Sequence, residues 1–123
     1  MDLRNLMIMI NEKKGLNAQL ALEFDCTLEV EDLEPLVKVI NYSINYIQQL
    51  TDKPLQISLY SGFSENSLVF QAFTSQSEFP PISEKVSEAL NPFNGSINFD
   101  AEPGKFVQVQ LKFKKDEGES GTP

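Results

Sequence analysis

The sequence predicts an α+β fold, a two-layer α/β sandwich in which helices cover one face of a sheet. Three stretches carry this prediction. Residues 18–30 alternate between apolar and polar side chains, as a strand with one buried face does. Residues 32–50 place apolar side chains at helical spacing, and residues 95–114 have the pattern of a β-hairpin. Strands with one apolar face need a layer of helices to bury that face.

The bulk composition limits the class of protein and its partners. The 123 residues suffice for one domain with its own core. The formal net charge is −8, so we expect no binding to nucleic acid or to an anionic membrane. The chain has no histidine, which excludes a phosphohistidine, a histidine base and a histidine metal ligand within it.

The same composition indicates a cytoplasmic protein. The single cysteine, Cys26, cannot form an internal disulfide, which favours a reducing compartment, and we expect it to be a core residue. No apolar run reaches the about 20 residues that cross a bilayer. The first residues lack the basic region and the cleavage site of a signal peptide.

The first two predicted elements are a helix and a long strand. Residues 2–13 show helical spacing of apolar side chains and end at a lysine pair before Gly15, a favourable C-cap. We therefore assign residues 1–15 to an N-terminal helix. Residues 18–30 form the strand, with a bend or break expected near Asp25 because a strand of this length is unusual.

The main helix is expected over residues 32–50, with Asp32 as its N-cap and Pro35 in its first turn. One apolar stripe faces the sheet, and a second stripe lies nearly opposite: Val39, Tyr42, Tyr46 and Leu50. A helix that is apolar on two sides needs two neighbours. The second neighbour is either another chain or the N-terminal helix, through Leu3, Leu6, Met7 and Ile10.

The remaining elements complete the order α-β-α-β-β-α-β-β. Strands are expected at 54–61 and 67–74, and a short helix at 82–90. The hairpin then closes a single domain over residues 16–114. The polar tail 115–123 is expected to be disordered.

The closing hairpin carries the clearest likeness to a known family. A glycine opens the strand in residues 94–102, and Glu102-Pro103-Gly104-Lys105 leads into the alternating strand 106–113. With the order of elements over residues 16–114, this resembles the histidine-kinase-like ATPase (Bergerat, or GHKL) domain of sensor histidine kinases. The resemblance implies a mixed, mostly antiparallel sheet and a place in bacterial two-component signalling.

The resemblance also implies a nucleotide site beside the main helix. Asn41 and Asn45 reproduce the family's two asparagines four residues apart. By analogy Asn45 is a magnesium ligand and Asn41 lies near the phosphates, while Gln48 stands where the family often has a basic residue. The other interpretation is that both asparagines are solvated or capping residues beside a filled groove, since two amides attract magnesium only weakly.

Other parts of the family's ATP machinery are not matched. Phe79-Pro80-Pro81 is similar to the family's Ile-Pro-Pro. In that register Thr74, Gln76 and Glu78 replace the aspartate and the two glycines of the Asp-x-Gly-x-Gly turn. The bulk of Gln76 and Glu78 and the negative charge of Glu78 would oppose a nucleotide there. Residues 83–93 then run almost directly into the hairpin, which leaves no room for an ATP lid or a second glycine-rich turn.

These departures predict a pseudoenzyme: a non-catalytic regulatory or adaptor protein of signal transduction that acts by protein–protein contact. No catalytic residue, metal ligand or cofactor is expected. The expected interface, toward a protein partner or a second copy in a homodimer, comprises Val39, Tyr42, Tyr46, Leu50, Leu3, Leu6, Met7 and Ile10. The alternative is a protein that binds ATP with magnesium in a reduced pocket at Asn41, Asn45 and Thr74. A third is a stand-alone domain of a mobile or phage-like element with an unrelated binding role.

Overall fold

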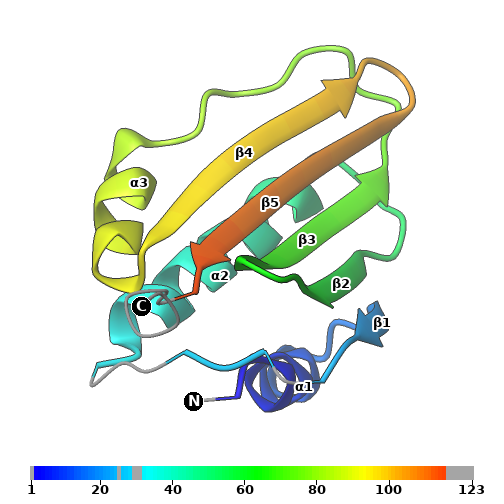
Figure 1. The fold of residues 1–123 in the computed structure, drawn as a ribbon. Helices are drawn as coiled ribbons and strands as arrows, with labels where there is room; N and C mark the ends of the chain where they lie inside the picture. Colours follow the sequence, from blue (N-terminus) through cyan, green and yellow to red (C-terminus); the bar gives the residue numbers. More distant parts are fainter. Residues whose placement is uncertain (1, 25, 29–31, 116–123) are drawn as a thin grey trace, which may run out of the picture.

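The computed structural model describes residues 2–24, 26–28 and 32–115. Five strands form one sheet in the order β1-β2-β3-β5-β4 (Figure 1). The pair β1–β2 is parallel and the other neighbouring pairs are antiparallel. In chain order the elements are α1 Leu3–Lys14, β1 Gln19–Leu22, α2 Glu34–Gln48, β2 Gln56–Ser61, β3 Glu65–Phe73, α3 Glu84–Leu90, the 3-10 turn η1 Asn91–Phe93, β4 Gly95–Glu102 and β5 Phe106–Lys114.

Helices lie on one side of this sheet. In Figure 1 α2 runs behind the strands and α3 stands beside the start of β4. The apolar sides of the strands and of α2 meet in one core, whose largest fully buried side chains include Ile40, Ile44, Phe70 and Phe113. The predicted two-layer α/β sandwich and its element order are therefore confirmed.

The N-terminal helix is capped at both ends by local chemistry. The Asp2 carboxylate accepts a hydrogen bond from the backbone N–H of Arg4 at 2.9 Å, as an N-cap residue does. Gly15 adopts φ 61°, the left-handed conformation that suits glycine at a C-cap. The helix predicted over residues 2–13 is present, and its apolar face is buried inside the chain.

The strand predicted over residues 18–30 is too long: β1 ends at Leu22, and the described residues 23–24 and 26–28 lie outside it. In a parallel ladder the Ser61 N–H would bond the backbone carbonyl of Glu23. Instead the Glu23 carboxylate accepts this bond at 2.7 Å, so the ladder ends. The buried Cys26 follows in irregular chain, where its carbonyl accepts from the Leu3 N–H at 2.8 Å. The bend expected near Asp25 lies outside the described residues.

The main helix begins two residues later than predicted. The N-cap position is Leu33, yet the Asp32 carboxylate still accepts from the Glu34 N–H at 3.0 Å. Pro35 sits in the first turn, where its missing N–H costs no helical hydrogen bond. The predicted tail falls almost entirely on residues 116–123, which lie outside the described residues.

The second face of the sheet carries polar side chains in register. Gln19, Gln56, Gln71 and Gln108 lie directly opposite one another across four strands. No described helix crosses this open face in Figure 1. Gly95 starts β4 where a Cβ atom would lie 3.1 Å from the Phe113 ring, so glycine allows the edge strand to approach the core.

Candidate functional site

The two asparagines singled out in the sequence lie one turn apart on α2. Asn45 is exposed, and Asn41 is half-buried. The Oδ1 atom of Asn41 is buried and has no hydrogen-bond partner among the described residues. A buried amide oxygen without a partner is uncommon, because its desolvation is not compensated. This oxygen is the polar group of α2 whose burial the described residues leave uncompensated.

Thr74 has its hydroxyl engaged in the fold. This hydroxyl donates to the carbonyl of Leu50, just beyond α2, and accepts from the backbone N–H of Gln76 at 3.0 Å. The side chain is buried. Thr74 therefore links the end of β3 to the end of α2. Neither of these hydrogen bonds reaches Asn41 or Asn45.

The second apolar stripe of α2 is covered by the segment that leads into α3. The hydroxyl of Tyr46 donates to the Pro80 carbonyl at 2.5 Å, and the hydroxyl of Tyr42 accepts from the Ser83 N–H at 2.9 Å. These two hydrogen bonds fasten residues 79–83 to the helix. Burial is the main cause that raises the pKa of Tyr46, so its phenol stays a hydrogen-bond donor at neutral pH.

Four rings complete this arrangement, and we call Tyr42, Tyr46, Phe79 and Phe99 the aromatic cap. Tyr46 meets Phe99 edge-on, with ring centroids 5.7 Å apart. Phe79 lies at the same centroid distance from Phe99, and the two tyrosines stack at 6.3 Å. Such pairs bury apolar area in geometries that suit the ring quadrupoles. The cap joins α2, the segment before α3 and the edge strand β4.

The residues predicted as a partner interface are covered by the chain itself. Only Tyr42 is half-buried; the others are fully buried, namely Val39, Tyr46, Leu50, Leu3, Leu6, Met7 and Ile10. This corrects the expectation that they present a free surface. The sequence left two possible neighbours for the tyrosine stripe, the N-terminal helix or another chain. The structure places a third there, because Pro80 and Ser83 supply backbone groups that match the two hydroxyls.

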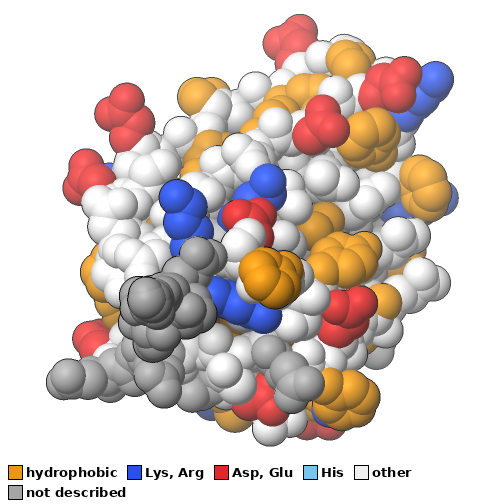
Figure 2. Space-filling model, in the orientation of Figure 1, with side chains coloured by type: hydrophobic (Ala, Val, Ile, Leu, Met, Phe, Trp, Pro, Cys, Tyr) orange, Lys and Arg blue, Asp and Glu red, His pale blue; other side chains and the backbone are white. Residues whose placement is uncertain are grey.

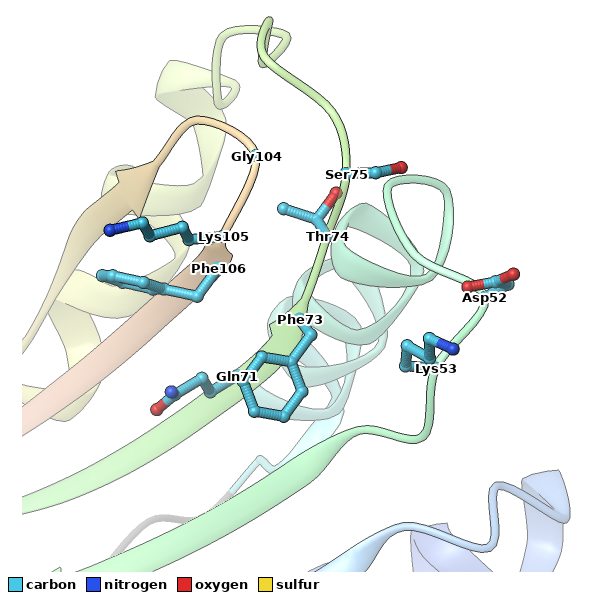
Figure 3. Close-up of a pocket in the computed structure, with 9 residues that line it drawn as sticks. All are labelled: Asp52, Lys53, Gln71, Phe73, Thr74, Ser75, Gly104, Lys105 and Phe106. Carbon is cyan, nitrogen blue, oxygen red and sulfur yellow. The ribbon is translucent and has the colours of Figure 1, made fainter.

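A hollow of about 730 Å³ opens where β3 ends and β5 begins (Figure 3). The β4–β5 turn with Lys105 borders one side and the loop with Lys53 borders the other. Phe73, 61% exposed, lies between them and offers a flat apolar surface. The complete lining is Asp52, Lys53, Gln71, Phe73, Thr74, Ser75, Gly104, Lys105 and Phe106.

The hollow presents two lysines and an exposed aromatic ring among its lining residues. Lys105 is paired with Glu102 at 3.1 Å, which reduces the positive charge available there. The Thr74 hydroxyl is engaged with Leu50 and Gln76, and the lining contains no histidine. Of these residues only Thr74 was a candidate site residue in the sequence, because the lining comes from three segments that no single motif links.

Two further features concern possible metal ligands and the single cysteine among the described residues. Residues 2–24, 26–28 and 32–115 contain no group of three or more acidic, cysteine or histidine side chains that could hold a metal ion. Burial raises the pKa of Cys26, while a hydrogen bond from Ser61 opposes this rise, so the thiol remains protonated at neutral pH. None of the described helices is long and apolar enough to cross a membrane.

Comparison with known proteins identifies the fold. No protein-family model matches the chain, and no curated protein matches it in sequence. Among solved structures, the Acinetobacter baumannii histidine kinase AdeS superposes with a TM-score of 0.64 at 14% identity, covering 94% of this chain and 66% of that chain. A nucleotide-free catalytic domain of the histidine kinase ThkA gives a TM-score of 0.59 at 14% identity, covering 91% and 90%. The chain has the fold of a histidine kinase catalytic domain.

A third similar structure shows such a kinase with a partner. ThkA in complex with the response regulator protein TrrA superposes with a TM-score of 0.51 at 17% identity. The match covers 92% of this chain but 39% of that kinase chain, and the chain spans just under two thirds of AdeS. At these identities the similarity establishes the fold and leaves activity to be argued from the site.

Proposed function

We propose that this protein is a non-catalytic regulatory or adaptor protein of bacterial two-component signalling, built on a histidine kinase catalytic-domain fold and acting in the cytoplasm by protein–protein contact. The aromatic cap is the observation that carries the proposal. The resemblance puts a nucleotide beside the asparagines of α2 and the segment after β3. In this chain, Phe79 and residues 80–83 lie on the neighbouring face of α2, held by two tyrosine hydroxyls.

Opening this region would have an energetic cost. The hydrogen bond that Tyr46 donates and the one that Tyr42 accepts each contribute about 1 kcal/mol net. Each ring pair of the cap adds about 0.5–1.5 kcal/mol beyond its buried area. Segment 79–83 leads directly into α3 at Glu84, which limits how far the chain can move without unwinding that helix. These costs support a scaffold that keeps its shape without a nucleotide.

The charges of the chain also argue against the binding of a nucleotide. Gln48, exposed on the last turn of α2, supplies no cation for a triphosphate. The chain as a whole carries a formal charge of −8, which opposes the approach of a polyanion. The partner we propose is a protein of the response regulator class, since ThkA is seen in complex with such a protein.

Thermal melting with magnesium and ATP, ADP or GTP, each at millimolar concentration, tests the loss of nucleotide binding. A ligand at 100 times its Kd would stabilise the fold by about 2.7 kcal/mol. For a domain of this size that corresponds to a rise in Tm of roughly 10 °C. The proposal predicts no shift with any nucleotide. A clear rise with magnesium and ATP would reject it.

The alternative function is a nucleotide-binding protein that uses magnesium and a reduced pocket. The unpaired Oδ1 atom of Asn41, one turn from the exposed Asn45, favours it. If a nucleotide shifts the Tm, Asn45→Ala should abolish the shift. Gln48→Ala, also exposed on α2, is the matched control and should retain it. Loss of the shift in both variants would point to a general effect on α2.

A further inference from the structure

One corner of the open sheet face combines exposed aromatic rings with lysines. We call Tyr60, Phe63, Lys112, Lys114 and Lys115 the Phe63 corner. The Phe63 side chain is fully exposed in the β2–β3 turn, and Tyr60 is 51% exposed on β2. Exposed rings of this size are costly unless something covers them. Figure 2, which views this face, shows lysine and arginine side chains near hydrophobic ones around the end of β5.

The strand register brings these residues together. Tyr60, Ser67 and Lys112 lie opposite one another on three adjacent strands. Lys114 pairs with Glu65 at the start of β3, directly after the turn that carries Phe63. The side chains on this row and the next therefore project from the same face of the sheet.

Backbone hydrogen bonds hold the corner in place. The Gly62 N–H donates to the Glu65 carbonyl at 2.9 Å and closes the turn. The Lys115 N–H donates to the Ser64 carbonyl at 2.9 Å, and its Nζ lies 3.5 Å from the Ser61 hydroxyl. Phe63 therefore lies on a turn that is already held by hydrogen bonds. A partner that packs on it would lose little conformational entropy in ordering the backbone.

Lysines gather at this corner although the protein as a whole is acidic, and two carboxylates lie close to them: Glu65 beside Lys112 and Glu23 on the N–H of Ser61. Lys112, Lys114 and Lys115 are three of the ten Lys and Arg residues in a chain of net charge −8. Lys112 reaches Glu65 at 3.7 Å across a half-exposed surface. Neither Lys114 nor Lys115 has an acidic group of the described residues within salt-bridge distance. Among the described residues, Lys114 is thus exposed and outside any ion pair beside these rings, whereas the half-buried Lys115 holds its ammonium against the Ser61 hydroxyl.

We propose that the Phe63 corner docks an acidic segment of a partner protein, with an apolar side chain of that segment against Phe63 and Tyr60 and its carboxylates on the lysines. This inference rests on the proposed function as a protein-contact module and names the chemistry of the partner. Aromatic side chains that pack in the centre of an interface, with charges around them, supply much of the binding energy of protein complexes.

Charge favours a peptide over the other polyanions. Nucleic acid and anionic membranes are large, uniformly negative surfaces, and the net charge of −8 repels them over most of the molecule. A short acidic segment needs to contact only the corner. At physiological salt the Debye length is about 8 Å, so the distant acidic residues are largely screened from it.

Binding of defined probes tests the proposal. The first probe is a labelled ten-residue peptide of alternating Glu and Leu, followed by versions with Gln for Glu and Ser for Leu. An oligo-dT strand and phosphatidylglycerol vesicles represent the other polyanions. Fluorescence anisotropy gives the Kd, and backbone NMR shifts locate the contact. We expect the Glu–Leu peptide to bind most tightly, with shifts centred on residues 60–64 and 112–115, and to weaken as salt rises.

Two pairs of variants distinguish the corner from a general effect. Phe63→Ser and Lys114→Glu should each weaken the Kd of the Glu–Leu peptide by about tenfold or more. Met9→Ser and Lys13→Glu, both exposed on α1 and part of neither the hollow nor the corner, are the matched controls and should stay within about twofold. All four are surface changes, and equal melting temperatures would show that they fold.

The outcomes that overturn the proposal are separate from those that overturn the proposed function. Tighter binding of oligo-dT or vesicles, equal binding of the Gln–Leu peptide, or no binding of any peptide rejects the Phe63 corner as an acidic-segment site. Peptide shifts centred on α2 also reject it, but leave the protein-contact function standing. A nucleotide-dependent rise in Tm rejects the proposed function whatever the peptides do.

Discussion

The edge-on contact between Tyr46 and Phe99 predicts a measurable coupling between two elements far apart in the sequence. Tyr46 lies on α2 and is only 4% exposed, whereas Phe99 lies on the edge strand β4 and is 40% exposed. Their ring centroids are 5.7 Å apart at an interplanar angle of 83°. We propose the variants Tyr46→Leu, Phe99→Leu and the double variant, because leucine keeps apolar volume and removes the ring interaction.

The single variants should differ in a predictable way. Tyr46→Leu loses the ring contact and the hydrogen bond to Pro80, worth about 1 kcal/mol, together with part of a well-packed ring. We expect a loss of about 2–4 kcal/mol in the free energy of unfolding. Phe99→Leu affects a half-exposed side chain, so we expect about 1 kcal/mol. The coupling energy between the two should be about 0.5–1.5 kcal/mol.

Urea unfolding followed by circular dichroism gives these energies. The four proteins form a double-mutant cycle, and an unchanged slope against urea would show that the variants unfold from a similar native state. Tyr60→Leu is the matched control, because its ring is exposed on the opposite face and should change stability by less than about 0.5 kcal/mol. A cycle additive within about 0.3 kcal/mol would refute the aromatic cap as a packed unit.

Two further predictions concern a turn and alkaline stability. Gly62→Ala places a Cβ atom 2.6 Å from the Glu65 carbonyl oxygen, a backbone atom, so the turn must shift. We expect urea unfolding to show a loss of about 1–3 kcal/mol in the free energy of unfolding. The control Ser64→Ala, in the same exposed turn, should change that free energy little. Burial raises the pKa of Cys26 and of Tyr46 above their unfolded values. The stability that each contributes is therefore complete below its unfolded pKa and is lost as pH rises through its folded pKa. Unfolding energies from pH 7 to 11 should be flat at first and then fall. Cys26→Ala should remove the earlier part of the fall, and an identical profile in that variant would contradict the assignment.

Local chemistry explains why much of the fold could be read from the sequence. Asp2 and Gly15 cap α1 through groups only a few residues away, and Gly104 provides the φ of 76° at the final hairpin turn. Helical spacing in α2 and alternation in β5 follow directly from which side chains must reach the core. Such signals depend on neighbouring residues, so the order of elements was predicted correctly.

Contacts between distant residues decided the candidate site. The alternation over residues 18–30 fits any extended chain, and only the Glu23 carboxylate on Ser61 determined where β1 ended. The apolar character of Tyr42 and Tyr46 was evident in the sequence, but their cover was not. Which segment lies on a helix face depends on the path of the whole chain.

The sequence by itself determined the class of fold, the elements in order and the resemblance to a histidine kinase catalytic domain, because caps, turns and periodicity are short-range properties. Only the tertiary structure decided that the Thr74 hydroxyl bonds to Leu50 and Gln76. The same holds for the hydrogen bonds that join Pro80 and Ser83 to the two tyrosine hydroxyls. It also assembled the Phe63 corner from the turn after β2 and the end of β5. These are long-range contacts, and their partners are selected by packing rather than by spacing along the chain.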